Sequence, residues 1–165
     1  MALPVLNPYA SDCAACSGLC CVAPAFEVSE DFGLDKAAET PCPHLSADDS
    51  CRIHAELPER GFRGCVAYEC WGAGPWVTRE LGSWRSDPSK AALETFMRVR
   101  PLFELSMLLE LARGRYASPE LDAARARIAA RLGSAAAMSA PGRAEDERFA
   151  REALRALARG SKEEG

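Results

Sequence analysis

The sequence predicts a mainly α-helical protein in two parts: a small, irregular, metal-stabilised cysteine-rich module, followed by an α-helical C-terminal region. Three observations predict this. All eight cysteines lie between Cys13 and Cys70, and the last 95 residues contain none. Residues 13–75 are rich in Cys, Pro, Gly and Asp and show no sustained helical or strand period. From residue 86 onward, three segments have the apolar spacing and the end residues of helices.

The module is predicted over residues 1–78 and the three-helix region over residues 86–160. Within the module, residues 23–28 suit an extended segment, residues 29–34 suit one helical turn, and residues 72–76 (GAGPW) should break the chain. Such an irregular region has few regular contacts to offset chain entropy, so we expect the cysteines to hold it.

The first predicted helix begins at Ser86 or Asp87, with Pro88 in its first turn, and ends at Gly114. Pro101 inside it predicts a kink or two abutting helices. The second spans residues 118–133, and the third spans residues 144–160 beyond a linker at 134–143. Residues 102–111 are apolar almost all round, so we expect them to be buried in the protein or against a protein partner or a homodimer mate.

Charge and the N-terminus narrow the function further. The net charge is −4, and acidic groups interleave with the C-terminal arginines, so we expect no nucleic-acid partner. Residues 1–12 lack a basic stretch and an apolar core, so we expect no signal peptide. No apolar run is long enough to span a bilayer, so we expect no membrane partner. We therefore expect a cytoplasmic protein, where reducing conditions disfavour disulfides.

Eight cysteines within 58 residues favour metal ligation over disulfides, redox thiols or plain buried thiols. Soft thiolates bind zinc or iron, and C-x2-C spacing places two sulfurs on one ion. Zinc ribbons, two-cluster ferredoxins and thioredoxins fit less well, because their second C-x2-C, their C-x2-C-x2-C-x3-C-P run or their βαβ unit is missing. The candidate ligands are Cys13, Cys16, Cys20, Cys21, Cys42, Cys51, Cys65 and Cys70.

The neighbouring pair Cys20 and Cys21 suggests how eight sulfurs divide. In extended backbone, neighbouring side chains point to opposite sides, so each cysteine can serve a different four-sulfur site. The alternative is that one of the pair is a ligand and the other is a buried thiol.

Two histidines and three arginines are further candidates around the sulfurs. His44 and His54 follow Cys42 and Cys51 closely and are additional candidates for ligation, or for hydrogen bonding to a ligand or a carbonyl. Arg52, Arg60 and Arg63 lie between Cys51 and Cys65 and suit N–H···S contacts that offset thiolate charge, or ordinary surface positions.

The motifs CAACSGLCC, CPHL, CRIH and GCVAYEC together resemble the zinc- or iron-chelating cysteine-cluster family with the C-x-x-C-x-x-C-C signature (YkgJ-like). They are most similar to the variant that precedes pentapeptide repeats in some actinobacterial proteins. The resemblance covers about residues 10–78 and implies that all eight cysteines bind metal. The chain departs from the family in its three-residue gap before the doublet and in His54, where the family often has tyrosine.

Three functions remain open at this point. The first is a metal-chelating protein in which zinc or iron, at one or two sites, folds the module while the helices pack or bind a partner. The second is an iron–sulfur protein for electron transfer or redox sensing. The third is a metalloenzyme of unknown substrate, with His44 or His54 as the non-sulfur ligand that a catalytic site usually needs.

Overall fold

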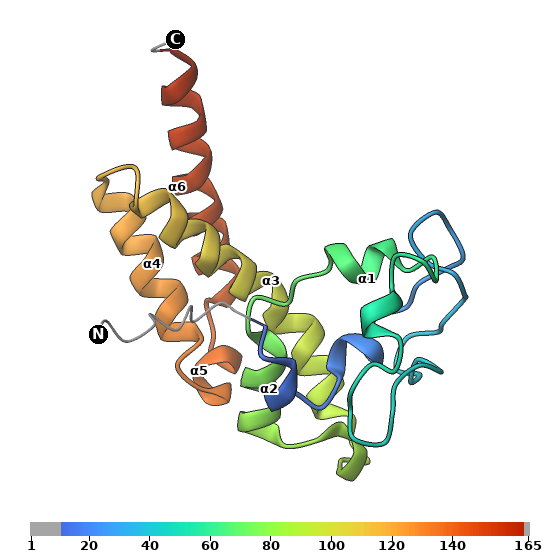
Figure 1. Ribbon diagram of the computed structural model, residues 1–165. Helices are drawn as coiled ribbons and strands as arrows, with labels where there is room; N and C mark the ends of the chain where they lie inside the picture. The colour runs from blue at the N-terminus through green and yellow to red at the C-terminus, as the bar shows by residue number, and fades with distance from the viewer. Residues whose placement is uncertain (1–10, 164–165) are drawn as a thin grey trace, which may run out of the picture. The chain divides into compact units, whose positions relative to one another are not determined.

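The structure is a computed structural model that describes residues 11–163 (Figure 1). The chain divides into two compact units, Met1–Arg100 and Pro101–Gly165. The mainly α-helical prediction is confirmed: the β structure of the described residues consists of two isolated bridges. Most of the segment for which we expected no signal peptide lies outside the described residues.

The first unit consists of short helical turns joined by irregular chain. Its elements are η1 (Cys13–Ala15), η2 (Leu19–Cys21), η3 (His54–Glu56), α1 (Arg63–Ala67), α2 (Ala73–Leu81), η4 (Trp84–Ser86) and the start of α3 (Ala91–Arg113). The helical turn predicted at residues 29–34 is wrong, because this stretch forms bends. A bridge between Phe26 and Lys36 closes the loop that contains it.

The prediction that GAGPW breaks the chain is also wrong, because α2 begins within it. Gly72 has a positive φ of 89° and turns the chain into the helix. Pro75 falls in the first turn of α2, where its missing N–H has no intrahelical partner to lose. The first half of α2 is buried, which places Gly74 and Trp76 in the interior of this unit.

Apolar side chains also contribute to the module. Leu19 and Val22 are fully buried beside the cysteine doublet. A second cluster contains Ile53, Leu57 and Phe62. Its partly buried neighbours are Phe26, Phe32, Leu34, Cys51 and Cys65. The cysteines are therefore not the only groups that hold this region. The sequence pattern missed the cluster because its members come from turns without a regular period.

The second unit contains the rest of α3 together with α4 (Pro119–Arg131), α5 (Ala135–Ser139) and α6 (Arg143–Glu163). Ser118 caps α4 and Pro119 is its first residue, as predicted. The linker predicted at 134–143 contains the short helix α5 instead, capped by Ser134. Helices α4 and α6 pack side by side (Figure 1). Arg131 joins them through its Nε, 2.7 Å from Asp146 Oδ2.

Helix α3 is continuous through Pro101, and the division between the units falls just before that proline. It starts at Ala91 rather than beside Pro88, because Asp87 and Ser89 form a separate turn. Along its second half Leu102, Leu105 and Leu109 are buried. Leu108 and Leu111 are exposed on the single chain, so their burial against a protein partner or a homodimer mate stays a prediction. No helix in the described range is long and apolar enough to cross a membrane.

Candidate metal centre

The eight cysteines come from five separate stretches of the first unit, and all are free thiols. Cys13 starts η1, which the Asp12 side chain caps, and Cys16 follows directly. Cys20 and Cys21 end η2. The remaining four come from distant points in the sequence, two from irregular chain before and after the 43–50 loop, one from α1 and one from the turn before α2. They are Cys42, Cys51, Cys65 and Cys70.

Four of these thiols form one neighbourhood, which we call the Cys13 group. Its members are Cys13, Cys16, Cys20 and Cys70. Burial raises the pKa of Cys13, and the negative charges of Cys16, Cys70, Glu69 and Cys21 raise it further. Gly74 lies against two of the sulfurs: a Cβ built there would fall 2.7 Å from Cys16 Sγ and 3.7 Å from Cys70 Sγ. Only glycine leaves room for both sulfurs at this point of α2.

The other four thiols form the Cys21 group. Its members are Cys21, Cys42, Cys51 and Cys65. Burial raises the pKa of Cys65 to about 11, and the charges of Cys21, Cys42 and Cys51 add to the effect. The pKa of Cys51 is raised by burial first and then by Cys21 and Cys42, against a lowering hydrogen bond from Ile53. The Cys42 N–H donates to the Cys21 carbonyl oxygen at 2.8 Å, which fixes these two cysteines side by side.

The doublet joins the two groups. The Sγ atoms of Cys20 and Cys21 lie 3.9 Å apart. The hydrogen bond to Cys21, with burial next, raises the pKa of Cys20, whereas the bond from Cys20 and the nearby Lys36 lower the pKa of Cys21. We assign Cys20 to the Cys13 group and Cys21 to the Cys21 group, and the division of the doublet between two metal sites stays a prediction.

Backbone N–H groups point at several of the sulfurs. Burial raises the pKa of Cys16, and hydrogen bonds from Leu19, Gly18 and the Thr78 side chain offset part of that increase. In the same way His44 and Leu45 N–H groups offset part of the increase at Cys42. Donors aimed at sulfur stabilise the thiolate form, which is the form that binds metal. Both groups are thus supplied with partners for negative sulfur.

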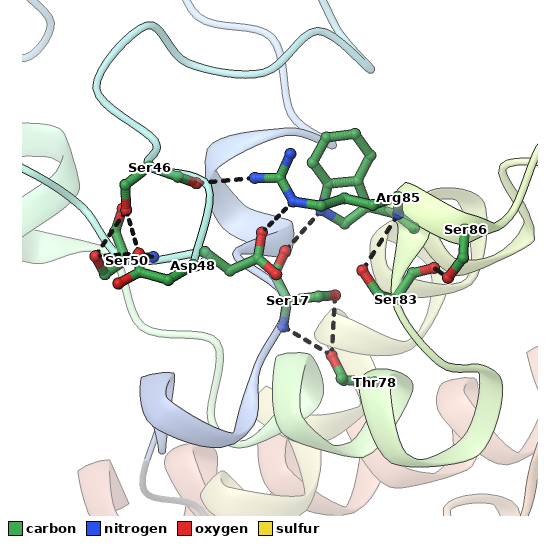
Figure 2. Close-up of polar contacts among 10 residues, drawn as sticks. Ser17, Ser46, Asp48, Ser50, Thr78, Ser83, Arg85 and Ser86 are labelled. Carbon is green, nitrogen blue, oxygen red and sulfur yellow. Dashed lines mark hydrogen bonds and ion pairs between the residues drawn. The ribbon is translucent and has the colours of Figure 1, made fainter.

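A polar network holds the segment between Cys16 and Cys20 in place (Figure 2). The Ser17 N–H donates to Thr78 Oγ1 at 3.1 Å, and Trp84 Nε1 donates to the Ser17 carbonyl oxygen at 2.7 Å. Arg85 next to Trp84 reaches the 46–50 loop, with its Nε 2.7 Å from Asp49 Oδ1. The segment is therefore fixed to α2, to η4 and to the loop between Cys42 and Cys51 without help from sulfur.

Lys36 is a buried cation beside the Cys21 group that the sequence analysis did not identify. Its side chain is buried, and its Nζ donates to the carbonyl oxygens of Val22, Ala37 and Thr40. Burial lowers its pKa, and the charges of Cys42 and Cys21 raise it in part. The sequence favours the arginines as counter-charges because they lie between Cys51 and Cys65. The signal for Lys36 was its position as the only lysine in the acidic first 75 residues.

The other sequence-predicted residues take different roles. The His44 ring packs edge-on against Phe62, with 5.4 Å between ring centroids. The backbone N–H of His44 forms a hydrogen bond to Cys42 that lowers the pKa of this thiol. His54 is exposed at the start of η3. Arg52 donates to the Pro43 carbonyl oxygen, and Arg60 pairs with Glu56 at 2.8 Å. Arg63 is exposed at the start of α1. The predicted N–H···S contacts from these arginines stay a prediction.

Within residues 11–163, no three or more Cys, His, Asp or Glu side chains converge closely enough to hold a metal ion as they are placed. The two groups are thus sets of neighbouring thiols rather than formed coordination shells. The residues that sequence reasoning missed, Gly74, Thr78 and Lys36, act through packing and hydrogen bonding. Only their positions near cysteines in the fold identify them.

The fold and the sulfur groups define a helical protein with an irregular, cysteine-rich first unit. No protein-family model matches the chain, and no solved structure matches it. Over 107 residues it is 44% identical to the uncharacterized protein YybG of Bacillus subtilis (strain 168). The match covers 62% of this chain and 38% of YybG, so the chain spans well under half the length of that relative. The resemblance to the cysteine-cluster family therefore stays a prediction.

Proposed function

We propose that this protein chelates metal through its eight cysteines, with one zinc or iron ion in the Cys13 group and one in the Cys21 group. The metal would join segments that are far apart in the sequence and stabilise the first unit. Such a role suits a reducing compartment such as the cytoplasm, where thiols stay available for metal.

One observation supports the proposal: eight free thiols, from stretches up to 57 positions apart, lie near enough for the charge of one to raise the pKa of others. Four thiolates are the ligand set of structural zinc and of iron–sulfur clusters. Seven of the eight thiols are partly or fully exposed, so filling the core does not account for them. The division of Cys20 and Cys21 between the groups supports two sites rather than one.

The surroundings of the sulfurs fit such a centre. Gly74 leaves space where any other side chain would collide with Cys16 Sγ, at 2.7 Å. Backbone N–H groups near Cys16, Cys42 and Cys51 stabilise negative sulfur. When four thiols bind one divalent ion they release four protons, and the charge of the site becomes about −2. Lys36 beside Cys21 and Cys42 offsets part of this charge.

The same ligand set accommodates iron, so the iron–sulfur reading stays open as the alternative within this proposal. A metalloenzyme is less well supported, because it needs an open coordination position, usually beside a non-sulfur ligand. The His54 side chain is exposed, and the His44 ring packs against Phe62.

The proposal is tested on the full chain, purified without oxygen, by elemental analysis and optical spectra. We expect two metal ions per chain in colourless protein if the metal is zinc. Absorption near 400 nm, with several irons and inorganic sulfide per group of four cysteines, would indicate the iron–sulfur alternative. A strong chelator should then change the fluorescence of Trp71, Trp76 and Trp84, which all lie in the first unit. The helical circular dichroism of the whole chain should change far less, because α4, α5 and α6 lie in the second unit.

Protein that contains no metal after anaerobic purification, takes up none from added zinc or iron, and does not respond to the chelator would contradict the proposal. One metal ion per chain would contradict the two-site division but retain chelation.

A further inference from the structure

Lys36 is a buried cation that has no acidic partner among residues 11–163. Its side chain is 5% exposed. Its Nζ donates to the carbonyl oxygens of Val22 at 2.9 Å, Ala37 at 3.1 Å and Thr40 at 3.0 Å. An ammonium group has three donors, so all of them are used on neutral oxygens. In the part of the chain that the structure describes, no carboxylate forms an ion pair with it.

The contacts of Lys36 connect two segments of the Cys21 group. Val22 follows Cys21 directly, and Thr40 precedes Cys42 by two positions. The backbone hydrogen bond from the Cys42 N–H to the Cys21 carbonyl oxygen, at 2.8 Å, joins the same two segments. The Lys36 ammonium also lies over the Phe26 ring, 5.3 Å from its centroid. These contacts fix the charge beside two of the four sulfurs.

Burying an ammonium group costs free energy unless an opposite charge compensates it. The groups that supply such charge here are the sulfurs of Cys21 and Cys42, whose negative forms favour the charged lysine. A four-thiolate centre carries excess negative charge whenever it holds a divalent ion. The buried lysine and the sulfur group therefore compensate each other.

The Cys13 group is built differently. Cys13 itself is exposed at the start of η1. The negative charge of the nearby Glu69 carboxylate raises the pKa of Cys13. Ser11 Oγ contacts both sides of this arrangement, because it donates to Glu69 and lies 2.9 Å from Cys70 Sγ. An exposed ligand beside a carboxylate is easier for water or a competing ligand to displace.

We propose that Lys36 is a positioning residue that supplies the counter-charge of the Cys21 group and makes it the slowly releasing metal site, while the Cys13 group exchanges its metal readily. This inference rests on the proposed function. It divides the work between the sites: the Cys21 group holds the fold, and the Cys13 group is where metal enters and leaves.

The test measures metal release from zinc-loaded full-length protein into excess chelator, followed with a chromogenic zinc indicator. We expect two phases of one metal ion each. Cys13→Ser should remove the fast phase and leave the slow rate unchanged. Lys36→Met should accelerate the slow phase by about tenfold or more, because one compensating charge is lost, and leave the fast phase unchanged. Lys36→Arg, which keeps the charge, should restore most of the slow rate.

Lys90→Met is the matched control, because Lys90 is an exposed lysine of the same unit that pairs with Glu39 at 2.6 Å. It should release metal like the wild type. If Lys36 had only a structural role, Lys36→Met and Lys36→Arg would both accelerate both phases, and that result would overturn the inference.

If Lys36→Met does not fold, Cys13→Ser decides: loss of the slow phase, or one common phase in the wild type, contradicts the assignment. Failure to bind any zinc would instead refute the proposed function.

Discussion

The Sγ atoms of Cys20 and Cys21 lie 3.9 Å apart, and the two thiols nevertheless belong to different sulfur groups. Cys20 lies with Cys13 and Cys16, and Cys21 lies with Cys42, Cys51 and Cys65. Two neighbouring residues thus join the two halves of the candidate metal centre.

Replacing either residue of the doublet should remove one metal ion and leave the other. We expect Cys20→Ser and Cys21→Ser each to purify with one ion per chain, and the double variant with none, measured by elemental analysis. Ala14→Ser is the control, because it adds a hydroxyl at an exposed position nearby without removing sulfur. A single variant that keeps both ions would show that its cysteine is not a ligand.

Gly74→Ala should damage the Cys13 group specifically. The added methyl group would lie 2.7 Å from Cys16 Sγ, and relieving such an overlap costs about 1–3 kcal/mol. We expect loss of the metal ion of that group and a matching fall in the free energy of unfolding. Gly114→Ala is the control, because a Cβ there meets nothing closer than 3.5 Å. Equal behaviour of the two variants would contradict the close approach of α2 to these sulfurs.

Thr78→Val should loosen the segment between Cys16 and Cys20. The Ser17 N–H loses its acceptor, which lies at 3.1 Å, and Ser17 is buried. A buried donor without a partner costs about 1–3 kcal/mol, so the free energy of unfolding should fall by that amount, measured by denaturant titration of tryptophan fluorescence. Thr40→Val is the matched control, since Thr40 is exposed and donates to Ala38 at 3.4 Å. An unchanged denaturation midpoint of Thr78→Val would show that Thr78 does not stabilise this segment.

The metal-free chain should lose stability in alkaline solution through Cys65. Its pKa in the fold, about 11, lies above the ordinary 9.0, because burial favours the neutral thiol. A raised pKa contributes stability that is complete below about pH 9 and is lost as the pH rises towards 11. Cys65→Ser should reduce this alkaline loss, measured as denaturation midpoints from pH 7 to pH 11. An identical pH profile in the variant would exclude Cys65 as the source.

How far the sequence predicts this protein depends on the length scale of the signal. The cap at Ser118, the proline at Pro119 and the mainly helical class follow from local rules, and all are confirmed. Helix α2 was missed because Gly72, Gly74 and Pro75 read as a break. In the fold, Gly72 turns the chain and Pro75 occupies the first turn of α2. Gly74 leaves space for the sulfurs of Cys16 and Cys70. Each of these helix-breaking residues is therefore compatible with the start of a helix.

The candidate site shows the same contrast. Which residues are candidate ligands follows from cysteine count and compartment, and their division was suggested by the doublet alone. Lys36 and Thr78 could not be found this way, because their contacts with Val22 and Ser17 join positions 14 and 61 residues apart. The apolar cluster around Phe62 escaped for the same reason. Contacts between irregular segments leave no periodic trace in a sequence.

X-ray absorption spectroscopy of the metal in the purified full-length protein tests the central claim most directly. Two sites of four cysteines each should give a first shell made only of sulfur, four atoms per ion at about 2.3 Å, without a nitrogen contribution from His44 or His54. A shell that contains nitrogen or oxygen ligands, or fewer than four sulfurs per ion, would contradict it.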